Sequence, residues 1–202
     1  MTTRLYPRLG AASGALSALV LFAGSGHTSP GEVVREVAAL VLFLPFLAYL
    51  CSHLRQAEGQ GHWLSTTALA AGVAAITIKI FTGMPILALH HTIPGTPLHK
   101  ALDNMASAAS AISLYPLALM LTAIAILTLR TRLLPRWLGI GAATAATAAA
   151  IYAVYTSFNI NTNFGPALLL WALWTLTTSI TLLRKTRRRA TQQPQAEATA
   201  TT

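Results

Sequence analysis

Residues 101–129 read ALDNMASAASAISLYPLALMLTAIAILTL, and this stretch decides the fold class. After Asp103 it contains no charged residue before Arg130. A helix of this length rises about 40 Å, which exceeds the roughly 30 Å hydrocarbon core of a bilayer. Because peptide groups in lipid must find hydrogen-bond partners within their own segment, we predict a membrane-spanning α-helix. Pro116 near its middle is expected to kink the helix rather than divide it.

Five further apolar blocks flank this stretch. Of the 202 residues, 54% are hydrophobic and 9% are charged, whereas a soluble domain carries roughly 25% charged residues. We therefore predict an all-α, polytopic integral membrane protein, folded as a six-helix transmembrane bundle that forms a single domain of residues 1–183. The predicted spans are residues 9–26, 33–53, 63–82, 101–129, 137–158 and 166–183.

The first block, residues 9–26, allows a second interpretation. It is short and rich in small residues, it follows Arg4 and Arg8, and Ala23 and Ser25 resemble a small-residue cleavage site. These features are also typical of a cleaved signal peptide. Either way the next segment begins outside the cell, so the orientation of the later spans does not depend on the choice.

Basic residues at span ends predict the orientation, because cytoplasmic loops carry an excess of Lys and Arg. They gather before span one, between spans two and three, between spans four and five, and after span six: Arg4, Arg8, Arg55, Arg130, Arg132, Arg136 and residues 184–189. These four positions alternate with loops that carry few basic residues. We therefore expect both termini in the cytoplasm and the bundle in a bacterial plasma membrane.

The net charge of +9 does not indicate nucleic-acid binding, because most of the basic residues lie at span ends. The run from Arg184 to Arg189 directly follows a span and should attract anionic lipids of the inner leaflet. The tail of residues 184–202 is predicted to be disordered beyond this run. Cys51 is the single cysteine, so an internal disulfide is impossible.

Three charged residues fall within spans, where ionised groups are costly and commonly functional. Glu36 lies about one turn into span two, and Asp103 lies near the outer start of span four. Lys79 follows Trp63 by 16 residues, or ~24 Å of helix, so all three should lie at similar depth near the outer interface. One hypothesis is that they form a polar binding cluster facing the bundle interior. The alternative is that Lys79 extends to the headgroups and both acids lie in water.

Asp103, Ser107 and Ser110 share one face of span four, which should give that face a polar lining. The preceding outer loop carries His90, His91 and His99. Zinc requires three or four converging donors, and the spacing of these histidines matches no defined metal motif. We favour interfacial, pH-sensitive histidines over a metal site, and we expect no cofactor.

Two local features of the spans can also be interpreted. Thr82-Gly83-Met84-Pro85 is expected to break or kink the helix at the end of span three. Trp171 fits the outer aromatic belt, whereas Trp174 lies deeper and is expected to pack inside the bundle.

The sequence contains no nucleophile motif and no phosphate loop, so it does not point to an enzyme. The first expected class of function is a non-enzymatic regulatory or accessory membrane component, which could have a membrane-protein partner. The second is a small transporter or ligand-binding bundle that uses the outer polar cluster. The third is a membrane-embedded enzyme, which would require at least three outer side chains to converge, drawn from Glu36, His90, His91, His99 and Asp103.

Four stretches of the sequence are similar to segments of a known protein family: LRTRLLPRWLG (129–139), LLLWALWTLTTSITLLRK (168–185), SPGEVVREVA (29–38) and LRQAEG (54–59). They resemble an uncharacterised family of small multi-span membrane proteins of actinobacteria. The resemblance implies a multi-span topology. Its motifs are structural rather than chemical, so it assigns a role in catalysis to no residue.

Overall fold

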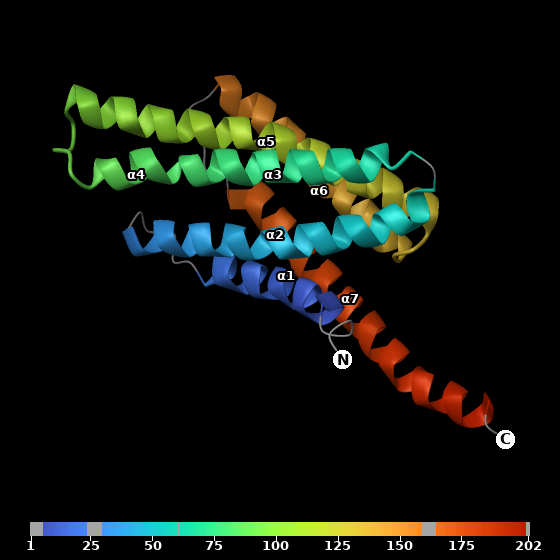
Figure 1. The fold of residues 1–202 in the computed structure, drawn as a ribbon. Coiled ribbons are helices and arrows are strands. Elements are labelled where there is room, and N and C mark those ends of the chain that lie inside the picture. Colours follow the sequence, from blue (N-terminus) through green and yellow to red (C-terminus); the bar gives the residue numbers. More distant parts are fainter. Residues whose placement is uncertain (1–5, 24–29, 60, 159–164, 201–202) are drawn as a thin grey trace.

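The computed structural model describes residues 6–23, 30–59, 61–158 and 165–200 (Figure 1). Within these ranges it contains helices and turns and no strand. The helices are α1 (Tyr6–Phe22), α2 (Pro30–Glu58), α3 (Trp63–Phe81), α4 (Gly83–Leu89), α5 (Pro97–Thr131), α6 (Arg136–Phe158) and α7 (Gly165–Ala200).

Five described segments are long and apolar enough to cross a membrane: Gly31–Glu58, Trp63–Leu89, Pro97–Thr131, Arg136–Phe158 and Ala167–Thr186. Helix α1 adds a shorter apolar helix, whose 17 residues rise about 25 Å. The predicted all-α, multi-pass bundle is therefore confirmed. Residues 24–26 of the first predicted span lie outside the described part of the chain.

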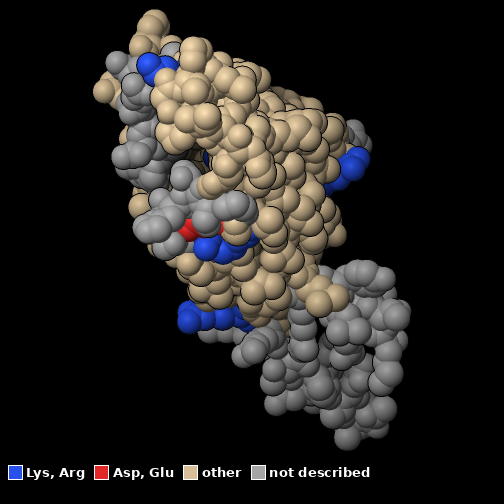
Figure 2. Space-filling view, turned by 90° about the vertical axis from the view of Figure 1, so that its left-hand side faces the viewer, with Lys and Arg blue, Asp and Glu red and all other residues tan. Residues whose placement is uncertain are grey.

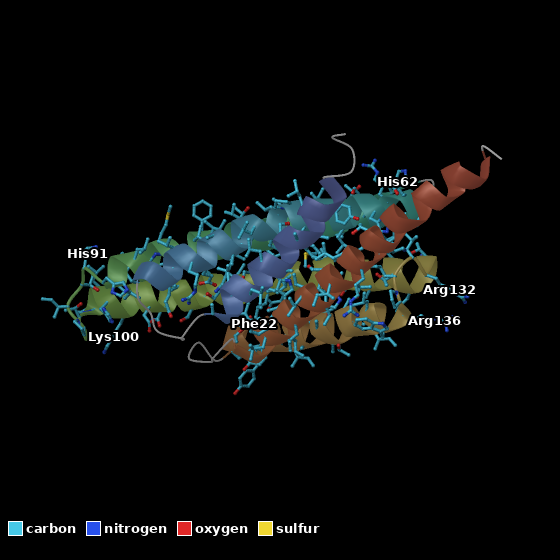
Figure 3. All side chains as sticks on the ribbon, turned by 90° about the horizontal axis from the view of Figure 1, so that it is seen from below. Phe22, His62, His91, Lys100, Arg132 and Arg136 are labelled. Atoms are coloured by element: carbon cyan, nitrogen blue, oxygen red, sulfur yellow. The ribbon has the colours of Figure 1, made fainter. Side chains whose placement is uncertain are left out.

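The two ends of the bundle differ in chemistry. Figure 3 shows His91 and Lys100 at one end and His62, Arg132 and Arg136 at the other. We call them the histidine end and the arginine end. In Figure 2, which looks onto the histidine end, basic and acidic side chains lie next to each other, and an Arg35–Glu32 ion pair of 3.3 Å belongs to this end.

Six helices close into a ring. Each packs against the next in the order α1, α2, α3, α5, α6 and α7, and α7 returns to α1 (Figure 1). Helix α4 prolongs α3 and packs on α5. This order leaves the middle of the ring lined by side chains from several helices at once, and the candidate site lies there.

Small residues let α1 approach its neighbours closely. A Cβ atom on Gly10 would lie 2.7 Å from Cβ of Tyr49, and one on Gly14 would overlap Phe46 of α2 and Ser179 of α7. The Ser17 hydroxyl donates a 2.7 Å hydrogen bond to the carbonyl of Ala39. Small residues at a helix interface allow this packing inside a bilayer. Helix α1 is thus an integral part of the ring.

The predicted break after span three is present. Helix α3 ends at Phe81, and α4 begins at Gly83 and continues in much the same direction (Figure 1). Pro85 has no N–H to donate into the preceding turn, which accounts for the interruption. Thr82 between the two helices keeps helical backbone angles, and its hydroxyl donates to the carbonyl of Lys79 at 2.6 Å.

Polar contacts organise the arginine end. The Glu58 carboxylate accepts hydrogen bonds from the N–H groups of Leu64 (2.8 Å) and Ser65 (3.1 Å), so the end of α2 caps the start of α3. Lys185 donates at 2.9 Å to the carbonyl of Leu133, in the turn between α5 and α6.

Helices α5 and α7 can be compared with the predictions for Pro116 and for the C-terminal tail. Helix α5 runs without interruption past Pro116, as expected. Helix α7 continues through the basic run to Ala200, whereas composition predicts disorder in this tail. The difference has a physical reason. Extending an existing helix avoids the cost of nucleation, and the Arg, Lys, Gln and Ala residues of the tail are good helix formers, although Pro194 is not.

Candidate functional site

Lys79 connects three helices inside the bundle. Its Nζ atom lies 3.2 Å from Oε1 of Glu36 on α2 and donates to Oγ of Ser110 on α5 at 3.4 Å. The side chain of Lys79 is 16% exposed and that of Glu36 is 34% exposed, so the ammonium side of the pair is mostly buried and the carboxylate side is half-buried. Lys79 lies ten residues before Leu89, the last residue of α4, which is ~15 Å along the helix. The structure thus brings together two of the three residues of the predicted cluster.

Asp103, the third residue of that cluster, lies elsewhere. It is exposed and forms no ion pair among the described residues. Asp103 precedes Ser110 by seven residues, so it lies ~10 Å farther toward the histidine end. Asp103 therefore belongs to the approach to the Glu36–Lys79 pair and not to the pair itself.

An open pocket of about 580 Å³ lies between α4 and α5 at the histidine end. We call it the vestibule, and its lining residues are Ile86, Leu89, His90, Thr92, Pro94, His99, Asp103, Ala106, Ser107 and Ser110. Asp103, Ser107 and Ser110 all line it, which confirms the predicted polar face of α5.

The three histidines of the metal hypothesis separate. His90 and His99 line the vestibule, whereas His91 is exposed and does not. A hydrogen bond of 2.9 Å joins Nδ1 of His99 to the Thr92 hydroxyl. Within the described ranges, no group of three or more His, Cys, Asp or Glu side chains is placed to hold a metal ion.

A second, smaller cavity of about 40 Å³ lies in the middle of the ring. We call it the central cavity. Helices α1, α2, α3, α5 and α7 contribute its lining: Leu21, Glu36, Leu40, Phe43, Gly72, Ala75, Ile76, Lys79, Ser113, Leu114, Leu117, Met120, Leu168 and Trp171. The vestibule and the central cavity adjoin, because Ser110 lines the first and accepts the hydrogen bond of Lys79, which lines the second.

The bundle is tightly filled on the far side of the central cavity. Large side chains there are less than 2% exposed: Phe46, Leu47, Leu50, Leu54, Leu121, Ile124, Leu127 and Leu138. A Cβ atom on Gly72 would overlap Leu47 and lie 2.8 Å from Sδ of Met120, so α2, α3 and α5 meet closely at this level. The polar path from the histidine end therefore stops at an apolar layer.

The expectation that Trp171 belongs to an outer aromatic belt is wrong. Trp171 is 4% exposed, lines the central cavity, and packs edge-on against Phe43 with ring centres 4.9 Å apart. Trp174 lies inside as predicted, and its Nε1–H donates to the carbonyl of Leu138 at 3.1 Å. Residues three apart share a helix face, so the interior position of Trp174 implied the same for Trp171.

Several residues of this site carry no distinctive sequence signal. Phe43, Gly72, Leu114 and Met120 are ordinary residues of apolar blocks, and only the order of helices around the ring brings them together. Ser110 and Ser113 were the available signal, as hydroxyls on the face of α5 that also carries Asp103.

No protein-family model matches the chain, and no match was found among curated proteins or solved structures.

Proposed function

We propose that this chain is a multi-pass protein of the bacterial plasma membrane that binds a small polar solute from the outer side. The solute enters the vestibule and reaches the Glu36–Lys79 pair at its floor. This is the ligand-binding or transport class among the three expected from the sequence. The resemblance to small actinobacterial membrane proteins is compatible with the proposal and assigns no further role to a residue.

One observation supports the proposal: within a bundle of apolar helices, Lys79 of an ion pair donates a hydrogen bond to Ser110, and Ser110 lines an open pocket. Withdrawing two charges from water costs several kcal/mol per ion, roughly, and apolar residues in their place often stabilise a protein. An intramembrane ion pair therefore points to function more than to stability. The pocket gives this pair access to water-borne solutes.

The orientation is part of the proposal. Arg55, Arg130, Arg132 and Arg136 are all exposed at the arginine end, which we assign to the cytoplasm. Both termini are then cytoplasmic, and the basic run from Arg184 lies beside the anionic lipids of the inner leaflet. The vestibule opens to the outside.

Cysteine labelling tests the proposal. On a Cys51→Ala background, Ser107→Cys and Ser110→Cys place thiols in the vestibule, and Ile112→Cys is the matched control. Ile112 lies on the same helix close to Ser110 but is 55% exposed on the outer surface of the bundle, where lipid would surround it. A membrane-impermeant maleimide added to intact cells should label positions 107 and 110 at least tenfold faster than position 112. Equal labelling rates at all three positions would show that water does not fill the vestibule and would contradict the proposed function.

A further inference from the structure

The central cavity has two charged residues in its lining, and they are of opposite sign. Glu36 and Lys79 pair there, and the other residues described in its lining are uncharged. The site without ligand is therefore electrically neutral. A ligand of net charge would leave one of these two ionic groups without a partner between apolar helices, and leaving a largely buried ion unpaired costs a few kcal/mol, roughly.

Resting on the proposed function, we infer that the ligand is a small zwitterion with a short apolar side group. Its carboxylate would bind Lys79 and its ammonium group would bind Glu36. Both charges of the site then keep a partner when the Glu36–Lys79 pair opens, and the loaded site stays neutral. Hydrogen bonds between ionised groups are about twice as strong as those between neutral groups, which favours a zwitterion over an uncharged polar solute.

The central cavity fits the apolar part of such a ligand. Its volume of about 40 Å³ is enough for roughly three water-sized groups, at the 10–15 Å³ that one water requires. Phe43, Leu114 and Trp171 form apolar walls next to the ion pair. A chain of two or three carbon atoms can therefore leave the charged head at Glu36 and Lys79 and enter this space.

The vestibule adds selectivity against anions. Among the described residues that line it, Asp103 is the one acidic residue and none is Lys or Arg. An anion approaching Lys79 must pass this carboxylate, whereas a zwitterion has no net charge for it to repel. Entry and binding thus favour the same kind of molecule.

The experiment measures protection of the vestibule floor. Ser110→Cys on the Cys51→Ala background is labelled with maleimide in the presence of millimolar L-norvaline, a zwitterion with a propyl side chain. Three derivatives keep the propyl side chain and change the charge by adding a small blocking group: norvaline methyl ester is a cation at pH 6.5, N-acetylnorvaline is an anion, and N-acetylnorvaline methyl ester is uncharged. Norvaline should slow labelling at least threefold, and the three derivatives should leave the rate unchanged.

A variant with the same net charge is the control. The double variant Glu36→Met with Lys79→Met removes both charges, and norvaline should then no longer protect position 110 although labelling continues. Protection by a charged derivative, or equal protection by the uncharged one, would overturn the zwitterion assignment. So would a failure of norvaline to protect at all. In each of these cases, continued labelling of Ser110→Cys would remain consistent with the proposed solute-binding function. If Ser110→Cys were not labelled even without ligand, both the zwitterion assignment and the proposed function would be contradicted.

Discussion

The ammonium group of Lys79 lies 3.2 Å from the carboxylate of Glu36, although 42 residues separate the two along the chain. The same ammonium group donates to Ser110, so one side chain holds α2, α3 and α5 together at a single depth. Both members of the pair line the central cavity, and Ser110 lines the vestibule, so the proposed ligand would meet the same contacts that join these helices.

Breaking this pair from one side should be more harmful than removing it. Lys79→Met leaves the Glu36 carboxylate without its partner, and we expect a loss of roughly 2 to 4 kcal/mol in unfolding free energy. The double variant with Glu36→Met should regain most of that loss. Unfolding in detergent, followed as a double-mutant cycle, measures the coupling. Arg35→Met is the control, because Arg35 and Glu32 lie three residues apart on one helix and their ion pair joins no second helix, so its loss should cost less than about 1 kcal/mol.

The two tryptophans of α7 should respond differently to the same substitution. Trp174→Phe removes the hydrogen bond to Leu138 and should lower stability by about 1 kcal/mol beyond the effect of the smaller ring. Trp171→Phe removes an indole N–H that has no hydrogen-bond partner among the described residues, so only the effect of the smaller ring is expected. Thermal unfolding of both variants provides the comparison, and a larger loss for Trp171→Phe would contradict it.

Gly14 should tolerate no larger side chain. A Cβ atom there would overlap Phe46 and Ser179, so Gly14→Val must displace α1 from α2 and α7 and should cost about 1 to 3 kcal/mol. Ala12→Val, on the exposed face of the same helix, is the matched control and should be nearly neutral. Thermal unfolding of the purified variants measures both. Mass spectrometry of the purified wild-type protein should also find α1 still attached, and a mature chain starting after Ser25 would support the signal-peptide alternative.

The carboxylate of Glu58 should stabilise the start of α3. Glu58→Ala removes the acceptor for the N–H groups of Leu64 and Ser65, with an expected loss of about 1 kcal/mol, or roughly fivefold faster hydrogen exchange at these amides. Gln56→Ala, an exposed neighbour that takes no part in this cap, should leave the exchange rates unchanged. Equal exchange in both variants would mean that the cap contributes nothing.

The orientation predicts the behaviour of reporter fusions. A cytoplasmic fluorescent reporter should be active at either terminus, and a reporter that works only outside the cell should be active when inserted after Ile93, in the loop between α4 and α5. Activity of the external reporter at the carboxyl terminus would reverse the proposed topology.

The helical spans could be predicted because each depends on its own segment. A long block without charges has to pair its peptide groups internally, so residues 101–129 specify a helix without reference to any neighbour. Counting helix rise also placed Glu36 and Lys79 at one depth. The same counting placed Asp103 too deep, because α5 begins well beyond the level of the ion pair and Asp103 lies two turns outside Ser110.

The cavities could not be predicted in the same way. The central cavity exists because α3 lies beside α5 and α7 returns to α1, and this order depends on how helix surfaces fit together. Trp171 illustrates the limit. The position of Trp171 along α7 suggested a residue at the membrane interface. However, Trp171 lies on the face of α7 that points into the bundle, so its side chain is buried.

The ring of helices also has a consequence for biosynthesis. Ribosomes deliver α1 to the bilayer first and α7 last, so Gly14 and Ser179 can meet only after every intervening helix has been inserted. Translation that stalls before residue 165 would yield a chain whose α1 has only α2 to hold it. The ring can therefore close only after the polypeptide is complete. Until that moment, the face of α1 that will later contact α7 stays uncovered, and this face could mark an unfinished chain for degradation.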